Sequence, residues 1–217
     1  MRRSRARIGL LAGLLAWFQP ALAAGLVVQV TDTRGRPVAD AVVMVAAPAG
    51  AAAAAPPQTR TIDQKDETFV PYVEVFRPGD SVVFNNSDGT RHHVYSFAPA
   101  KSFEFVLRPG QQSPPLMLER LGAVSVGCNI HDRMITHLYV TEADRHARTD
   151  ASGSVRFDEL VPGLRTISVW HPQLRPGSSE LRREVELGAT GLAQPVAFAL
   201  PLVPDPRGIP DRERAPY

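Results

Sequence analysis

Short valine-rich stretches with alternating apolar and polar positions recur along most of the chain. YVEVF (72–76) and SVVFNN (81–86) place apolar side chains at about every second position, which is the period of a half-buried strand. Turn residues such as RPGD (77–80) separate these stretches, and no long segment shows the period of an amphipathic helix. The other predicted strands are 26–31, 41–46, 92–97, 103–107, 115–119, 123–127, 136–140, two strands within 149–172, 183–187 and 195–200. This spacing predicts an all-β fold, either a sandwich or a small barrel.

The first residues follow a different pattern. Four arginines precede an apolar run from Ile8 to Phe18, and Ala21-Leu22-Ala23 follows. Basic residues, a short apolar run and a small-x-small site together are typical of a cleavable secretory signal peptide. A membrane anchor is the alternative, although the run is short for a bilayer span. We therefore expect residues 1–23 to be a signal peptide and the mature protein to be periplasmic or secreted.

Charge and motifs exclude several classes of function. The chain has 24 Lys+Arg and 22 Asp+Glu, and four of the basic residues lie in the predicted signal peptide. The mature chain would therefore carry 20 basic and 22 acidic residues. A net charge of about −2 gives no basic surface for nucleic acid, and we expect no nucleic-acid partner. The sequence has no HExxH, no Gly-rich phosphate loop and no GxSxG. We therefore do not expect an enzyme.

Two stretches have a composition that disfavours packed structure. APAGAAAAAPP (47–57) is rich in alanine between glycine and proline, and we expect residues 51–57 to be a linker. Residues 201–217 are rich in proline and charge, and we expect them to form an unfolded tail.

The candidate chemistry lies in CNIHDRM (128–134), a predicted loop between two strands. Cys128 is the only cysteine of the chain, so it cannot form an intramolecular disulfide. His131 and Met134 follow it at intervals of three. A thiolate, an imidazole and a thioether, with one more histidine, form the donor set of an electron-transfer copper site. His92-His93, at the start of a predicted strand, can supply that histidine, and only one of the two should reach the metal because adjacent side chains on a strand point to opposite faces.

Several nearby polar residues allow two interpretations. Asn86, Asp88, Asn129 and Asp132 either support the ligands from outside the first coordination sphere or are ordinary turn residues. Asp132 is also an oxygen donor if the ion is zinc. Copper is favoured over zinc because zinc rarely binds a thioether and prefers four strong ligands. His137 is a competing donor, for which we expect a role in packing or at the surface.

These stretches resemble the cupredoxins, the small blue copper proteins. Asn85-Asn86, His92-His93-Val94 and the Cys-x2-His-x2-Met loop match the family pattern, although His93 stands where asparagine is usual. The resemblance implies that His92, Cys128, His131 and a weak axial Met134 bind one copper ion, with His93 as the alternative to His92. It also implies one-electron transfer with a redox partner protein. Residues 63–97 with GCNIHDRM further resemble bacterial methylamine-utilization-type proteins, whose usual loop is CNIHDWM, so Arg133 replaces a tryptophan.

The flanking segments resemble a different family. GLVVQVTDTRGRPVADAVVMV (25–45) and RTDASGSVRFDELVPGLRTISVWHP (148–172) are similar to the two halves of a carboxypeptidase-regulatory-like β-sandwich. We therefore predict that residues 24–50 and 142–200 form one β-domain, into which a cupredoxin-like domain (58–141) is inserted. Two alternatives to electron transfer remain open: a copper carrier or storage protein, and an adhesion or structural module in which metal binding is incidental.

Overall fold

The structure is a computed structural model that describes residues 24–47 and 56–208. The predicted signal peptide, most of the predicted linker and residues 209–217 lie outside the described residues. The described chain contains strands, turns and one 3-10 turn, and the expected all-β fold class is confirmed. The strands are β1 (Ala24–Asp32), β2 (Val42–Val45), β3 (Thr59–Lys65), β4 (Thr68–Val70), β5 (Val73–Phe76), β6 (Ser81–Asn86), β7 (His92–Ala98), β8 (Lys101–Leu107), β9 (Leu116–Met117), β10 (Gly122–Cys128), β11 (Ile135–Val140), β12 (Arg145–Arg148), β13 (Ser154–Leu160), β14 (Gly163–Trp170), β15 (Leu181–Leu187) and β16 (Val196–Leu200), and η1 is Pro206–Gly208.

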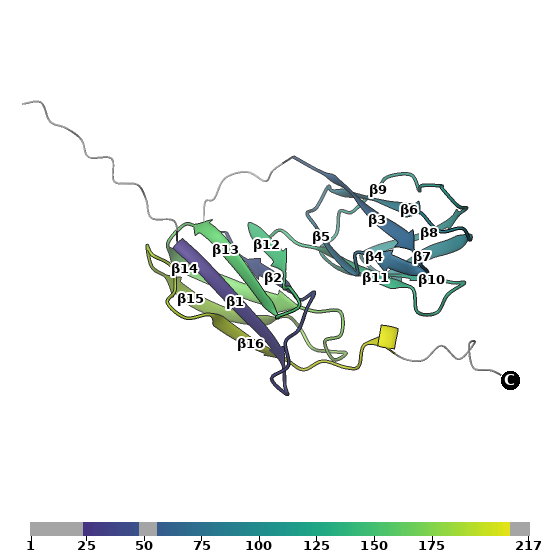
Figure 1. Cartoon of the computed structure of the whole chain (residues 1–217). Coiled ribbons are helices and arrows are strands. Elements are labelled where there is room, and N and C mark those ends of the chain that lie inside the picture. Colours follow the sequence, from purple (N-terminus) through teal and green to yellow (C-terminus); the bar gives the residue numbers. More distant parts are fainter. Residues whose placement is uncertain (1–23, 48–55, 209–217) are drawn as a thin grey trace, which may run out of the picture.

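One sandwich is built from strands near the two ends of the described chain (Figure 1). Its sheets have the orders β13-β1-β16 and β12-β2-β14-β15. Strand β1 alternates strictly, with Leu26, Val28 and Val30 buried and their neighbours partly exposed. Together with Ile167 and Val169 of β14 they form a core to which residues before 46 and after 146 contribute. We call this unit the flanking sandwich.

A second sandwich lies between these segments in the sequence. Its sheets have the orders β5-β11-β10-β7-β8 and β4-β3-β6-β9. Its core joins the inward-facing residues of both sheets, among them Phe84, Val94, Val126 and Leu138. Cys128 and Met134 also contribute to this core. We call this unit the middle sandwich, and it contains all the predicted ligand residues.

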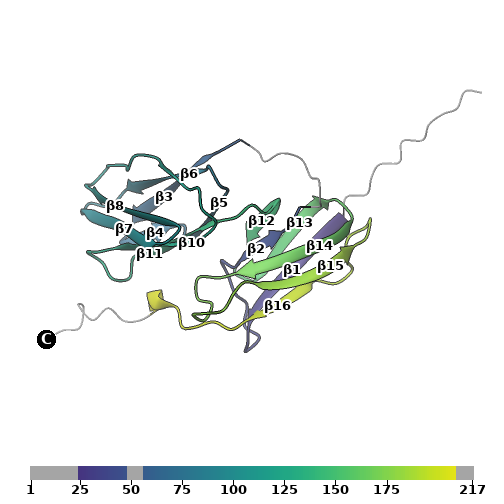
Figure 2. The same ribbon diagram turned by 180° about the vertical axis from the view of Figure 1, so that it is seen from behind.

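The two sandwiches meet across the outer faces of one sheet each (Figures 1 and 2). Val43 and Val45 of β2 face the flanking core, whereas Val42 and Met44 join a third apolar cluster. That cluster includes Val73 and Tyr139 of the middle sandwich, with Trp170 packed against it. Strand β2 is therefore buried on both faces, which explains its continuous apolar sequence.

The C-terminal segment differs from the prediction that residues 201–217 are unfolded. Leu202 forms a β-bridge with Leu174, and η1 follows. The guanidinium of Arg207 then lies 3.3 Å from the centroid of the Tyr72 ring. Residues 201–208, which we call the strap, thus run from the flanking sandwich to the middle sandwich (Figure 2). The prolines remove backbone donors but leave these side-chain contacts available.

No helix in the part of the chain that the structure describes is long and apolar enough to cross a membrane.

Candidate metal centre

Strand register brings the first two ligand candidates together. Strands β7 and β10 are antiparallel, with Cys128 opposite Val94. His92 lies two residues before Val94 and shares its inward face, because side chains on a strand alternate. His92 is fully buried, and its Nδ1 lies 3.7 Å from the Sγ of Cys128.

The loop after β10 brings in the other two candidates. The N–H of Met134 donates to the carbonyl of His131 (3.0 Å), and the N–H of Cys128 donates to the carbonyl of Met134 (3.1 Å). These bonds fold residues 128–134 into a compact turn between β10 and β11. They place His131 Nδ1 3.8 Å from Cys128 Sγ. The Met134 side chain is buried in the core on which the cluster sits.

The three donor atoms are close enough to share one ion. The ligand atoms of His92, Cys128 and His131 all lie within 4.8 Å of one another. A sulfur and a nitrogen bound to one zinc-sized ion, at about 2.3 Å and about 2.0–2.1 Å, lie about 3.5–3.8 Å apart for bond angles of about 110–120°. The two observed distances between Sγ and Nδ1 agree with this value. The residues therefore fit a metal ion held by one sulfur and two imidazole donors, and the buried Met134 is the further candidate, whose thioether suits copper better than zinc.

Asp88 and Asn86 support His92 on the side of the ring that faces away from Cys128. The Nε2 of His92 lies 2.8 Å from the Oδ2 of Asp88, so the carboxylate favours the tautomer that leaves Nδ1 free for a metal. Burial alone would raise the pKa of Asp88, but hydrogen bonds from the N–H of Glu67, the His92 ring and the N–H of Asp66 lower the pKa overall. The carboxylate is therefore ionised at neutral pH.

Asn86 fixes the loop that carries Asp88. Its Oδ1 accepts from the N–H of Asp88 (2.9 Å). Its Nδ2 donates to the carbonyls of Thr90 and Leu107, at 2.8 and 3.0 Å. Asn86 is fully buried, so these bonds satisfy an amide that would otherwise be costly to bury.

The other candidates lie outside the cluster. His93 points to the opposite face of β7, where its Nε2 pairs with Glu104 at 3.0 Å. The side chains of Asn129 and Asp132 are exposed, and only the backbone N–H of Asn129 makes a contact here, to the carbonyl of His93. His137 is buried beside Ser125 and Tyr72, which agrees with the expected role in packing.

One residue near the cluster was not among the predicted ones. Glu67, in the turn between β3 and β4, places Oε1 3.8 Å from the Nε2 of His131. Nothing in QKDETF (64–69) marks this glutamate as special, because the contact depends on a turn that precedes the His131 loop by more than 60 residues. Asp66 and Glu67 lack the glycine or asparagine that usually marks a tight hairpin, so the sequence indicates neither the turn nor what it faces.

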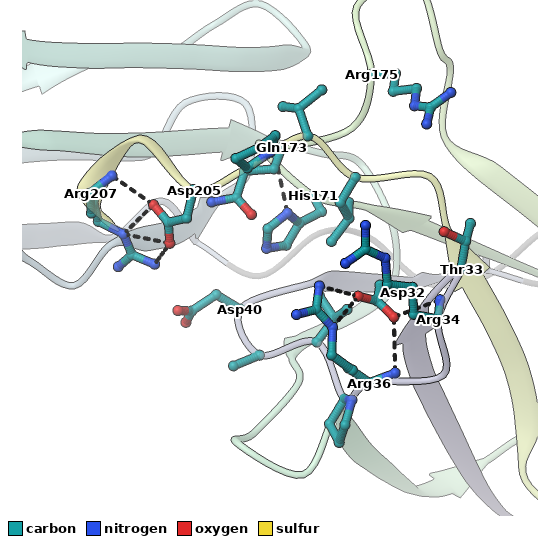
Figure 3. A pocket seen from close by; sticks show the side chains of 16 residues that line it. Asp32, Thr33, Arg34, Arg36, Asp40, His171, Gln173, Arg175, Asp205 and Arg207 are labelled. Atoms are coloured by element: carbon teal, nitrogen blue, oxygen red, sulfur yellow. Dashed lines mark hydrogen bonds and ion pairs between the residues drawn. The ribbon is translucent and has the colours of Figure 1, made fainter. Parts of the chain in front are cut away.

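A separate hollow lies away from the cluster. A cleft of about 680 Å³ is lined by the 32–40 turn, the 171–175 loop and the strap (Figure 3). Within it Asp32 pairs with Arg36 and Asp205 pairs with Arg207. Gln173 donates its N–H to the Nδ1 of His171, which braces the turn after β14 as Figure 3 shows. None of the predicted metal ligands lines this cleft.

Comparisons with known proteins gave structural neighbours only. No protein-family model matches the chain, and no curated protein matches it. A Cu(I) structure of an amicyanin variant matches at 16% identity and a TM-score of 0.34, covering 37% of this chain and 80% of that one. A purple cupredoxin from Nitrosopumilus maritimus matches at 18% identity and a TM-score of 0.33, covering 37% of this chain and 98% of that one. A copper-containing nitrite reductase from Thermus scotoductus matches at 24% identity and a TM-score of 0.35, covering 45% of this chain and 25% of that one.

Proposed function

We propose that the chain binds one copper ion at the cluster of the middle sandwich and serves as a one-electron carrier. The observation that supports this most directly is the approach of His92 Nδ1 and His131 Nδ1 to one cysteine sulfur, at 3.7 and 3.8 Å. Copper bound there would supply a Cu(I)/Cu(II) couple. His92, Cys128 and His131 would be its strong ligands and Met134 a weaker one.

The chain's contribution would be to keep the ligands fixed. His92 is held between β7 and Asp88, and the backbone bonds of the 128–134 turn hold Cys128 and Met134. Ligands that do not rearrange suit electron transfer, because both oxidation states can then be held with little motion. The buried thiolate would also be the shortest covalent route from the ion to the backbone. No group of the chain would need to take part in bond making.

The sequence supports two finer points of the proposal, and a third follows from the proposed function. The signal-like N-terminus supports export to the periplasm or beyond. The loop CNIHDRM supports a place among the bacterial methylamine-utilization-type cupredoxin-like proteins, with Arg133 as a departure from their pattern. An electron carrier needs a donor and an acceptor, so we propose a redox partner protein.

Copper titration of the purified protein tests the proposal. We expect one equivalent of Cu(II) to give an intense visible band from thiolate-to-copper charge transfer, together with a matching spin-resonance spectrum. Cys128→Ala should abolish the band, and His137→Gln serves as a matched control because His137 lies outside the cluster. A colourless complex, or binding of zinc alone, would contradict the proposal. A coloured complex without reversible one-electron cycling at an electrode would instead indicate a copper carrier.

A further inference from the structure

We propose that Glu67 is a positioning residue of the metal centre, which holds the imidazole of His131 and adds negative charge beside it. This inference rests on the proposed copper function. It concerns a residue of the β3–β4 turn that no part of the ligand pattern includes.

The two histidines of the cluster have the same arrangement of neighbours. Each directs Nδ1 toward the Sγ of Cys128, at 3.7 Å for His92 and 3.8 Å for His131. Each directs Nε2 toward a carboxylate, Asp88 at 2.8 Å and Glu67 at 3.8 Å. A carboxylate near Nε2 favours a proton on that nitrogen and leaves Nδ1 free to bind a metal. Glu67 would therefore act on His131 as Asp88 acts on His92, but through its charge at 3.8 Å, which is longer than a hydrogen bond.

The turn that carries Glu67 has an uncommon backbone. Asp66 and Glu67 both have a φ of 54°, in the left-handed region that side chains other than glycine rarely adopt. They are the two central residues of a hairpin in which Lys65 pairs with Thr68. Such turns usually contain glycine or asparagine, so this conformation is unfavourable for both residues here.

Asp88 stabilises this turn directly. Its carboxylate accepts the N–H of Asp66 at 2.6 Å and the N–H of Glu67 at 3.1 Å. The same carboxylate faces the Nε2 of His92. One side chain thus connects the turn to the first histidine, and the turn places Glu67 beside the second. These two backbone hydrogen bonds help to hold Asp66 and Glu67 in this conformation.

The charge of Glu67 should affect the bound ion. A negative charge next to a ligand favours the more highly charged oxidation state, so it strengthens Cu(II) binding and lowers the reduction potential. The Glu67 side chain is 41% exposed, so solvent screens part of this effect. Because the Glu67 side chain is partly exposed, substitutions at this position should not disturb the core.

Glu104 provides a matched control. It pairs with His93 at 3.0 Å on the outer face of the sheet that contains β7 and β10. Its side chain is 62% exposed. The pair therefore has the same chemistry as Glu67 and His131, but its histidine points away from the cluster.

The experiment compares Glu67→Gln, Glu67→Ala and Glu104→Gln with the unaltered protein. We expect Glu67→Ala to weaken Cu(II) binding about tenfold and to shift the reduction potential to a more positive value. Glu67→Gln should shift the potential in the same direction with a smaller loss of affinity, because the amide removes the charge but keeps an oxygen facing Nε2. Glu104→Gln should change neither quantity. Equal behaviour of the Glu67 and Glu104 variants would overturn the inference.

A second measurement on the metal-free protein separates this inference from the proposed function. Nitrogen-15 spectra of the imidazole rings report which ring nitrogen of His131 carries the proton. We expect the Nε2–H form in the unaltered protein and in Glu67→Gln, and a mixture of tautomers in Glu67→Ala. An unchanged His131 spectrum in Glu67→Ala would refute the positioning role, whether or not the protein takes up copper.

Discussion

The ring centroids of Tyr139 and Trp170 lie 4.4 Å apart, and the two residues belong to different sandwiches. Tyr139 is on β11 of the middle sandwich, and Trp170 ends β14 of the flanking sandwich. The hydroxyl of Tyr139 also donates to the carboxylate of Glu180, which precedes β15. Burial, followed by this hydrogen bond and charge, raises the pKa of Tyr139 far above its usual value, so it remains a neutral donor. The contact joins the sheet that holds the metal cluster to the flanking unit.

Trp170→Ala should weaken the connection between the sandwiches. The substitution removes aromatic contacts with Tyr139 and His137 and part of an apolar cluster. We expect a loss of about 2–3 kcal/mol in the free energy of unfolding, and two separate thermal transitions in place of one. Differential scanning calorimetry measures both effects.

Phe97→Ala is the control for this prediction. Phe97 is a large aromatic residue on the uncovered part of the same sheet and is 77% exposed. Its removal should change the unfolding free energy by less than about 0.5 kcal/mol. If Trp170→Ala behaves like Phe97→Ala, the contact between the sandwiches contributes little to stability.

The strap should contribute through Arg207. Its guanidinium lies over the Tyr72 ring, and its backbone carbonyl accepts a hydrogen bond from Arg133 Nη2 at 3.0 Å. A double-mutant cycle of Arg207→Met and Tyr72→Leu isolates the contact between cation and ring. We expect a coupling energy of about 1 kcal/mol from urea denaturation. Strictly additive effects of the two substitutions would show that the contact is not energetically significant.

Stability should fall as the pH falls from about 6.5 toward about 4. Burial is the main reason why the pKa of both His137 and His171 drops from 6.5 to about 4 in the folded protein. Asp40 and Asp205 oppose this shift at His171, and Arg207 adds to it. Between the two pKa values the unfolded chain binds more protons than the folded one, so the unfolding free energy rises with pH in this window.

Urea denaturation at pH 7, 6 and 5 measures this dependence. The maximum slope is about 1.4 kcal/mol per pH unit for each histidine. Replacing both residues with glutamine should reduce the slope between pH 6 and 5. A slope that stays the same in the double variant would assign the pH dependence to other groups.

Much of the fold followed from the sequence because its strands alternate. HHVYSF (92–97) and AVSVG (123–127) show the period of a half-buried strand, and both lie in strands whose inward residues build the core. Strand β12 was not predicted, because RHAR has no apolar alternation and is held by pairing with β2. Residues 201–208 were expected to be unfolded because their composition does not reveal the contact of Arg207 with a ring more than 130 residues earlier.

The cluster could be predicted only in part, for a similar reason. The spacing of Cys128, His131 and Met134 is local, and one turn of backbone decides it. The place of Asp88 beside His92 is also nearly local, because His92 follows Asp88 by four positions in the chain. The position of Glu67 depends on how the β3–β4 turn packs against the 128–134 loop. The periodicity of the sequence does not indicate that these two segments are in contact.

The opposite orientations of His92 and His93 lead to a final prediction. Both are histidines on β7, but His92 is fully buried against Cys128, whereas His93 pairs with Glu104 on the outer face. His92→Gln should therefore abolish the thiolate-to-copper band, because the cluster loses one of its two imidazole nitrogens. His93→Gln should leave the band in place, with an affinity within about twofold of the unaltered protein. Glutamine fills similar space in both cases, and circular dichroism checks that each variant is folded. Retention of the band in a folded His92→Gln variant, with its loss in His93→Gln, would mean that strand β7 is shifted by one residue in solution and that the outer face carries the ligand.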